Sequence, residues 1–396
     1  MKKQANIFFT VCFCLFLAAV ICMTVLNMGE TSTFIENRTL AEIPRYSGEA
    51  LLSGDYFSAW ETYLTDHAAA RNTALKINTW AEIWLLRLPV ISDVVVTDNL
   101  LLSFFEYGRW DTAYLEEASE KMADSLKSLD DYISERGGSF FYVGVPEQFS
   151  YFRSKYPDYL ENRDWILSKT NSLFSGDLKE RDISFINMDE EFEKLSKPEI
   201  YYFATDHHYS FHGALATCKK LVESINSAAE YNLKVPSEDD YILKMLPNPY
   251  IGSRDRKLYG LSGIQEKPVI GVLKEPVSYE RFDNGVRTDA PLYNLPQTDT
   301  ELVAYEIYMG GDIAETIIKT DRPELPNALI YGDSFTNAAE TILYSSFNET
   351  RSLDLRHYSA KTLREYIDEY KPDVVICIRD DSCFFNMDGN GQTGED

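Results

Sequence analysis

The stretch "NALIYGDSFTNAAETIL", residues 327–343, contains a strand, a turn and a helix in direct succession. Its apolar start predicts a buried strand, Gly332-Asp333-Ser334 predicts a turn, and the following residues predict a helix over 336–346. Ser334 is then expected at the carboxyl end of a parallel strand and at a helix N-terminus, where free N–H groups favour developing negative charge. A serine nucleophile with an oxyanion hole requires this setting, although serine is also a common helix cap.

The alternation of strands and helices continues on both sides of this stretch. Strands alternating with helices imply βαβ units, so we expect an α/β fold with a mostly parallel sheet and helices on both faces. The segment 235–300, rich in Pro, Gly and Tyr, is interpreted as loops and short strands inserted into this core. The pattern predicts strands at 139–145, 183–187, 351–357 and 372–378, and helices over 111–137, 162–175, 211–225 and 360–370.

The N-terminus predicts a membrane segment. Lys2 and Lys3 precede an uncharged run from Ile7 to Leu26, which is long enough to cross a bilayer, and the positive-inside rule puts the rest of the chain outside the cytoplasm. A cleaved signal and a lipid-modified Cys22 stay open as alternatives. The predicted organisation is a cytoplasmic stub (1–6), a transmembrane signal-anchor (7–27), an extracytoplasmic linker with a helical and hairpin lead-in (28–110), a catalytic domain (111–386) and a flexible tail (387–396).

The composition argues against nucleic acid as a partner and against a cysteine-based site. The formal net charge of −25 argues against nucleic acid, because phosphate binding needs a basic face. Only Cys218, Cys377 and Cys383 lie outside the apolar run, and their spacing predicts neither a metal site nor a disulfide framework. No cofactor is expected.

The second informative stretch is "TDHHYSFHG", residues 205–213, which holds three of the five histidines of the chain. A serine nucleophile needs a base and a group that orients the base. In an extended segment residues i and i+2 share a face, so Asp206 and His208 can meet while His207 points away. We predict that Asp206 orients His208, that His208 takes the proton of Ser334, and that Ser210 caps the next helix.

Two other interpretations of this cluster stay open. His208 and His212 are four residues apart and could share a Zn²⁺ with Asp206 if both lay on one helix. The helix is expected to begin near Ser210, however, which leaves His208 outside it, and no further Cys or His is adjacent. The cluster could also be purely structural. The triad is the preferred interpretation, and no metal is predicted.

The acid–His–His–aromatic sequence followed by a helix, "TDHHYSFHGA", resembles the family named for its DHHW motif. It also resembles the related alginate O-acetylation proteins, whose fold is SGNH-hydrolase-like. Other segments carry the resemblance across most of residues 30–386: "FIENRTLAEIP" (34–44), "YLTDHAAARN" (63–72), "YVGVPEQFSYF" (142–152) and "YMGGDIAETIIKT" (308–320). It implies a flavodoxin-like sheet with a circularly permuted motif order, since the acid–His motif precedes the serine.

Position by position, the resemblance implies Ser334 as nucleophile, His208 as base and Asp206 as its orienter. The sequence departs from the pattern in two places. Tyr209 replaces Trp, and "PDVVICIRDDS" has Arg379, Asp380 and Asp381 where the Asn-bearing strand motif is expected. The candidate oxyanion donors are the backbone N–H of Ser334 and the side chain of Asn337, which could also be a helix-surface amide. Possible substrate contacts are His207, Tyr209 and Tyr308; a sugar-stacking platform of Tyr201, Tyr202, Tyr305 and Tyr308 competes with ordinary aromatic packing.

The resemblance also implies a function. We expect a membrane-anchored O-acyltransferase, most simply an O-acetyltransferase, that modifies a cell-surface or secreted polysaccharide. Its acyl donor would be supplied through a multi-pass membrane acyltransferase. An esterase with the same triad, or a non-catalytic scaffold that binds polysaccharide, are the alternatives.

Overall fold

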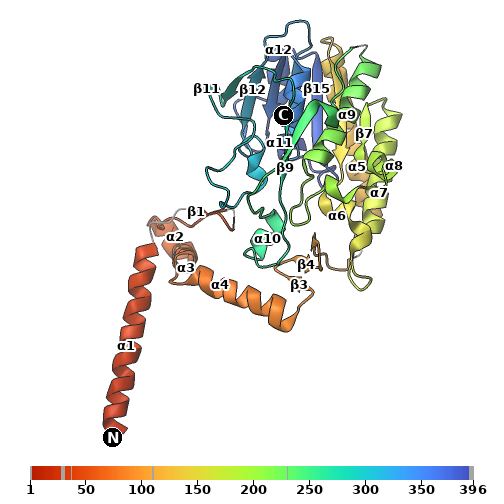
Figure 1. Cartoon of the computed structure of the whole chain (residues 1–396). Helices are drawn as coiled ribbons and strands as arrows, with labels where there is room; N and C mark the ends of the chain where they lie inside the picture. The colour runs from red at the N-terminus through yellow and green to blue at the C-terminus, as the bar shows by residue number, and fades with distance from the viewer. Residues whose placement is uncertain (1, 28–31, 37, 109–110, 230, 392–396) are drawn as a thin grey trace. The chain divides into compact units, whose positions relative to one another are not determined.

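Two units make up the chain, which the computed structural model describes at residues 2–27, 32–36, 38–108, 111–229 and 231–391 (Figure 1). Unit one comprises Met1–Thr97 and Asp255–Gly263, and unit two comprises Asp98–Arg254 and Ile264–Asp396. The second unit therefore begins before residue 111, and unit one takes a short piece of the predicted insertion. Residues 28–31, 37 and 109–110 of the predicted linker and lead-in, and 392–396 of the predicted tail, lie outside the described residues.

Unit one begins with helix α1, Lys2–Asn27. Among the described residues, α1 provides the one helical segment that is long and apolar enough to cross a membrane, Asn6–Leu26. The helical part of the predicted lead-in forms α3 (Asp55–Asp66) and α4 (Arg71–Trp80), and α4 runs on into the π-helical turn η1 (Ala81–Leu86). The predicted linker also contains short elements. These and the remaining elements are β1 (Ser32–Thr33), β2 (Arg38–Thr39), α2 (Gly48–Ser53), β3 (Val90–Ile91) and β4 (Val94–Val96).

An eight-stranded sheet organises unit two, with strand order β11-β10-β12-β14-β13-β15-β6-β7. The strands from β14 to β7 run parallel, whereas β12, β10 and β11 are antiparallel at one edge. The predicted mostly parallel α/β sheet is confirmed. The strands are β6 (Ser139–Val145), β7 (Phe185–Asn187), β10 (Glu280–Asp283), β11 (Val286–Thr288), β12 (Glu315–Lys319), β13 (Ala328–Gly332), β14 (Glu349–Leu353) and β15 (Val374–Asp380).

Helices cover the two faces of the sheet because successive strand residues point to opposite sides. Phe140 and Tyr142 of β6 join one apolar cluster with α5 (Thr112–Ser134), α7 (Asp164–Glu180) and α12 (Leu363–Tyr370). Phe141 points to the other side, where α9 (Phe211–Ala228) and α11 (Thr336–Leu343) pack together. The central strands β13 and β15 are buried along their whole length, which explains their continuous apolar sequences.

One expectation needs correction, and two segments add detail to the fold. "IYYFA" (200–204) adds no strand to the sheet: it forms the 3₁₀ turn η3 (Glu199–Tyr201) and a single antiparallel bridge from Tyr202 to Tyr209. The short strands expected within 235–300 are present, and two of them, β10 and β11, pair at the edge of the sheet. The first residues of the predicted flexible tail are packed, with Met387 against the apolar cluster and Asn390 2% exposed.

The smaller elements of unit two connect this framework. They are β5 (Leu101–Ser103), α6 (Gln148–Tyr151), η2 (Arg153–Lys155), α8 (Met188–Lys194), η4 (Glu238–Asp240), β8 (Tyr241–Met245), β9 (Val269–Leu273), η5 (Tyr305–Ile307), η6 (Tyr344–Ser346) and η7 (Gly389–Gly391). Strands β8 and β9 pair with each other in a separate two-stranded sheet. Helix α10 (Ser253–Lys257) spans the point at which the chain passes between the units.

The turn after β13 depends on close contact between two strand backbones. Gly332 is the partner of Ile378 of β15, and a Cβ added at Gly332 would lie 1.9 Å from the Ile378 carbonyl oxygen. Both groups belong to backbones held in the sheet, so neither can move away freely. Only glycine therefore fits at the end of β13, two residues before Ser334.

We therefore predict that Gly332→Ala destabilises unit two by roughly 1–3 kcal/mol or more, because its methyl group overpacks the sheet. Gly176→Ala is the matched control: it lies within α7, nothing lies within 4 Å of its added Cβ, and alanine should raise helix stability by roughly 0.5–1 kcal/mol. Thermal unfolding of the detergent-solubilised chain measures both. A Gly332→Ala protein as stable as the parent would show that the strands are not constrained at this point.

Candidate active site

Three side chains from two separate loops form a continuous hydrogen-bond chain. The Nδ1 atom of His208 lies 2.7 Å from Oδ1 of Asp206, and its Nε2 atom lies 2.6 Å from Oγ of Ser334. Asp206 and His208 are buried, whereas Ser334 is half-buried. Sequence reasoning assigned these residues to one site, and the structure brings them together in the predicted order.

The loop that carries Asp206 and His208 is held without a strand. The Tyr202–Tyr209 bridge closes its base, and the Ser210 N–H donates to the Tyr201 carbonyl at 2.8 Å. Ser210 also accepts the His212 N–H at 3.2 Å, so it caps α9 as predicted. The preceding Tyr202 and the start of α9 thereby fix both ends of the loop.

Two further side chains outside this loop hold its backbone. The Glu266 carboxylate accepts hydrogen bonds from the N–H groups of Ala204 and Thr205 and from the Thr205 hydroxyl. The Gln148 side chain, just after β6, donates to the carbonyls of Phe203 and Ala204 at 3.2 and 3.3 Å. Because Gln148 follows the carboxyl end of a parallel strand, the loop lies at the edge of the sheet that also carries Ser334. Neither residue was predicted, since no periodicity marks a loop support.

The Asp206 carboxylate is buried but remains ionised. Its Oδ2 atom accepts the Ser253 N–H at 2.7 Å, and its Oδ1 atom accepts the His208 N–H at 3.2 Å in addition to the ring contact. Burial alone would raise the pKa of Asp206, but the charge and hydrogen bond of His208, with smaller contributions from His207 and Ser253, hold it well below its usual range. This pKa is lower than in the unfolded chain, so ionised Asp206 stabilises the fold above about pH 4. That contribution is lost only as the pH falls toward the folded-state pKa.

The Ser334 turn is shaped by a buried carboxyl group. The two oxygens of Asp333 accept the N–H groups of Phe335 and Asp380, each at 2.9 Å. Burial and the neighbouring charge of Asp380 raise the pKa of Asp333. Helix α11 begins after Phe335 without a side-chain cap, so Ser334 does not act as the cap that was its competing interpretation. Asp333 and Asp380 were not predicted as site residues, although Asp333 follows β13 directly and Asp380 is the last residue of β15.

The two predicted oxyanion donors differ in their surroundings. Within the described residues, no hydrogen bond engages the Ser334 N–H. The Asn337 side chain is buried and donates to Oδ1 of Asp312 at 2.9 Å, so it is not a surface amide and part of its donor capacity is in use. The oxyanion role of each group stays a prediction.

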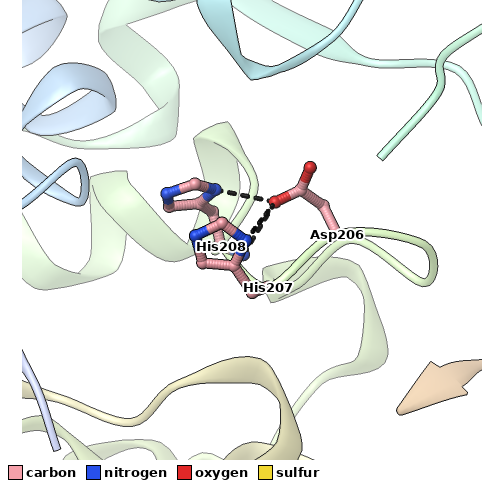
Figure 2. Close-up of side chains that lie close together, drawn as sticks. All are labelled: Asp206, His207 and His208. Carbon is pink, nitrogen blue, oxygen red and sulfur yellow. Dashed lines mark hydrogen bonds and ion pairs between the residues drawn. The ribbon is translucent and has the colours of Figure 1, made fainter. Parts of the chain in front are cut away.

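His207 does not point away from the pair, as the extended-strand argument predicted. Its ring lies against that of His208, with centroids 3.6 Å apart, and its Nδ1 atom is 3.3 Å from Oδ1 of Asp206 (Figure 2). The bend of the loop, rather than an extended backbone, brings both rings to one side. Nδ1 also hydrogen-bonds the Ser253 hydroxyl at 2.7 Å. Burial, together with the closeness of His208, lowers the pKa of His207 below its usual value.

The tyrosines predicted to contact substrate lie inside the protein. Tyr209 and Tyr308 are 0% exposed, and their hydroxyls donate to the carbonyls of Phe335 and Val269. Tyr305 is also buried, and its ring stacks on His208 with centroids 3.7 Å apart and planes 3° from parallel. These rings are buried by apolar packing and, for Tyr209 and Tyr308, by the hydrogen bonds of their hydroxyl groups. They therefore support His208 and its loop from inside the protein. Of the predicted substrate contacts, His207 alone is accessible, with 38% of its side chain exposed.

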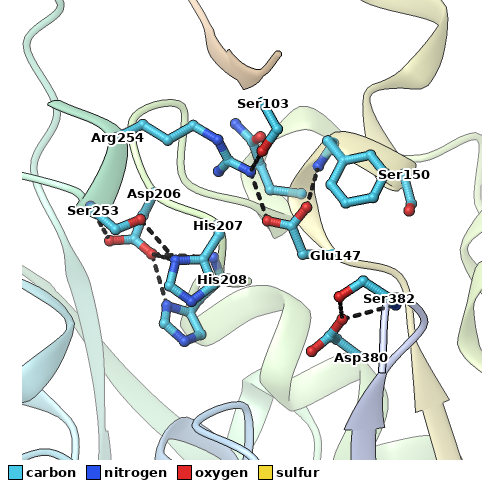
Figure 3. A network of polar contacts seen from close by, with 12 residues as sticks. Ser103, Glu147, Ser150, Asp206, His207, His208, Ser253, Arg254, Asp380 and Ser382 are labelled. Atoms are coloured by element: carbon cyan, nitrogen blue, oxygen red, sulfur yellow. Dashed lines mark hydrogen bonds and ion pairs between the residues drawn. The ribbon is translucent and has the colours of Figure 1, made fainter. Parts of the chain in front are cut away.

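A cavity of about 700 Å³ adjoins His207. Glu147 lines it and pairs with the buried Arg254 at 2.6 Å, while Arg254 also donates to the Ser103 hydroxyl at 2.9 Å (Figure 3). Its other polar lining is Asp380, Asp381 and Ser382, in the segment that departs from the family motif. The apolar lining is Phe105, Tyr114, Leu115, Phe149, Ile166, Leu167, Phe384, Phe385 and Met387.

The metal alternative has little support in the geometry of the described residues. Both ring nitrogens of His208 already have partners, and His212 lies elsewhere, with Nδ1 3.8 Å from Oε2 of Glu238. Ligand atoms of Asp206, His207 and His208 do lie within 4.8 Å of one another, as do those of the more exposed Asp312, Asp354 and His357. In the second group the Arg356 guanidinium already pairs with both carboxylates, at 2.6 and 3.0 Å.

Comparisons with known proteins extend the fold assignment. No protein-family model and no curated protein matches the sequence. Solved structures do match. PatB1 of Bacillus cereus is 21% identical, with 74% of this chain and 96% of that chain covered and a TM-score of 0.62. A second PatB1 structure, with a sulfonyl adduct, gives 20% identity and the same coverage and TM-score. A DHHW family protein of Eubacterium siraeum is 16% identical, covers 76% of this chain and 95% of its own, and has a TM-score of 0.56.

These likenesses confirm the predicted fold class. The chain has the SGNH-hydrolase-like α/β fold that the DHHW-type motifs implied, and a DHHW family protein is among its structural neighbours. The sequence identities are too low to carry chemistry from one protein to another.

We predict that His208→Ala and Asp206→Asn each lower the rate of ester cleavage by about 10³-fold or more, because the base is lost or left without the partner that orients it. His212→Ala should change the rate little, since its ring contacts none of the three residues. The assay is release of nitrophenol from a nitrophenyl acetate. Inactivation by chelators, together with stoichiometric zinc in the purified chain, would contradict this account and favour a metal site.

Proposed function

We propose that this chain is a membrane-anchored O-acyltransferase, most simply an O-acetyltransferase, that acts on a polysaccharide through an acyl-enzyme at Ser334. One observation carries the proposal: the unbroken hydrogen-bond chain from Asp206 through His208 to Ser334 at the carboxyl end of β13. A buried carboxylate, a base in contact with a hydroxyl and an accessible nucleophile together suit acyl transfer.

The geometry allows a balanced two-step reaction. Ser334 Oγ attacks the carbonyl carbon of an acyl donor while Nε2 of His208 takes its proton; the leaving group then departs with that proton. In the second step His208 removes the proton of an acceptor hydroxyl, whose oxygen attacks the acyl-enzyme. His208 returns the proton to Ser334 as the serine is released. Ionised Asp206 stabilises the imidazolium in both steps, and the Ser334 N–H is the default donor to the oxyanion.

The cavity beside His207 supports a carbohydrate acceptor. Its polar wall of Glu147, Asp380, Asp381 and Ser382 offers oxygen atoms that accept hydrogen bonds from sugar hydroxyls, and its aromatic side chains suit the apolar faces of sugar rings. The cavity volume of about 700 Å³ falls within the range typical of ligand sites. The polysaccharide itself is an expectation from the DHHW resemblance.

The membrane part of the proposal depends on α1. An uncleaved α1 would hold the catalytic unit outside the cytoplasm, as the two lysines before the apolar run predict. Acyl thioesters are cytoplasmic compounds, so an enzyme on the other side needs a donor that crosses the bilayer. A multi-pass membrane acyltransferase is the proposed source.

An esterase with the same triad is the second candidate function. The half-exposed Ser334 favours it, because water can reach the acyl-enzyme as readily as a sugar can. Water is present at about 55 M, so transfer prevails only where a bound hydroxyl has a higher effective molarity, which well-oriented groups achieve at about 10⁵ M or more. The two functions share the first step and differ in the second. A polysaccharide-binding scaffold, by contrast, would not need a buried carboxylate aligned with a base.

We predict slow hydrolysis of simple acetyl esters and faster acetyl transfer to an oligosaccharide that fills the cavity. Mass spectrometry of oligosaccharides incubated with the chain and an acetyl donor should detect added acetyl groups. Ser334→Ala should lose both reactions by about 10³-fold or more, because the nucleophile is absent. Ser227→Ala, at an exposed position in α9, is the matched control and should retain both.

Rapid deacetylation of a pre-acetylated polymer, with no acceptor ever modified, would establish the esterase instead. Full activity in Ser334→Ala would remove the acyl-enzyme mechanism altogether.

A further inference from the structure

The helix that runs through α4 and η1 in unit one exposes apolar side chains and buries a polar one. Ile77, Trp80 and Trp84 are 63%, 51% and 52% exposed, and their spacing of three and four residues puts them on one side of the helix. The side that packs inward contains Thr79 and Ile83. A helix on the surface of a water-soluble domain normally turns its large apolar residues inward, whereas this one exposes three of them beside polar residues such as Lys76 and Asn78. This helix is therefore suited to an apolar environment on its exposed side.

Further exposed apolar side chains follow Trp84. Leu85, Leu86 and Leu88 are exposed at 69%, 61% and 40%. Single exposed apolar residues are common, but six of them within residues 77–88, two of them tryptophans, mark a segment that binds something. We call these six residues, Ile77, Trp80, Trp84, Leu85, Leu86 and Leu88, the α4 patch.

A contact within unit one sets the level of α4 relative to the candidate membrane span. The N–H of Ala69, in the turn between α3 and α4, donates to Oγ1 of Thr24 at 3.1 Å. Thr24 lies two residues before the end of the apolar segment Asn6–Leu26, which corresponds to about 3 Å along a helix. A segment of 21 residues matches the hydrocarbon thickness of about 30 Å, so Thr24 lies at its outer edge. Helix α4 begins two residues after Ala69 and therefore starts at the bilayer surface.

The charges around the α4 patch also suit a membrane. Between residues 71 and 88 the basic residues Lys76 and Arg87 are exposed and the one acidic residue is Glu82, whereas Arg71 pairs with Glu36. Basic residues beside an apolar face are attracted to anionic lipid headgroups, and tryptophan favours the boundary between headgroups and acyl chains.

We propose that α4 and η1 lie on the outer surface of the bilayer, with the α4 patch buried among the headgroups and upper acyl chains. The chain then contacts the membrane twice, through the span α1 and through this surface helix. The second contact restrains unit one against the membrane, which a single flexible tether would not do. The proposal does not depend on acyl transfer.

Tryptophan fluorescence tests the proposal, because α1 contains no tryptophan. The full chain is reconstituted in phosphatidylcholine–phosphatidylglycerol nanodiscs whose lipids are either plain or brominated near the top of the acyl chains. We expect brominated lipid to quench the emission, and Trp80→Phe/Trp84→Phe to lose most of the quenched fraction. Trp165→Phe, at an exposed position of α7 in unit two, should leave that fraction unchanged, as should Ser334→Ala.

Equal emission in plain and brominated discs would overturn the proposal. Emission that is insensitive to bromine but shifts when more chains share one disc would assign the patch to a second copy. Quenching that persists in Trp80→Phe/Trp84→Phe would come from another tryptophan, such as Trp60 of α3, and would also contradict the assignment to α4. Phenylalanine retains the apolar character of both positions, so loss of folding is not expected to obscure these outcomes.

Discussion

The site depends on keeping one carboxylate ionised inside the protein. Asp206 is 2% exposed, and burying such a charge is costly unless donors surround it. Its donors come from its own loop, through the N–H and ring of His208, and from Ser253, far along the chain. Both loops must therefore be in place before the carboxylate can orient the base. The same donors that hold Asp206 fix the direction of the His208 ring toward Ser334.

The backbone around Asp206 is tightly packed. A Cβ added at Gly252 would lie 2.2 Å from the Thr205 carbonyl oxygen, so glycine is needed where the second loop meets the first. The Arg254 N–H donates to that carbonyl at 3.1 Å, and the Arg254 side chain pairs with Glu147 at the cavity. The short segment 252–254 therefore contacts both Asp206, which orients the base, and Glu147, which lines the cavity.

The sequence predicts the sheet well because its strands have local signals, and it also names the three residues that meet at the candidate site. Strand β13 and the Ser334 turn follow from an apolar run and a glycine, and Asp206 and His208 are two residues apart. The supports of the site have no such signal. Ser253, Glu266 and Gln148 reach the His loop only through the folded chain, and the burial of Tyr209 and Tyr308 is decided by packing in three dimensions. The position of His207 was wrong because the loop bends where an extended backbone was assumed.

The central claim is that His208 activates Ser334 as the nucleophile, and covalent trapping tests it most directly. The chain is treated with a sulfonyl fluoride that modifies activated serines, and its peptides are analysed by mass spectrometry. The account predicts one modified site, Ser334, in the peptide that contains "GDSF", and a much slower modification in His208→Ala. An unmodified Ser334, or modification at the same rate without His208, would contradict it.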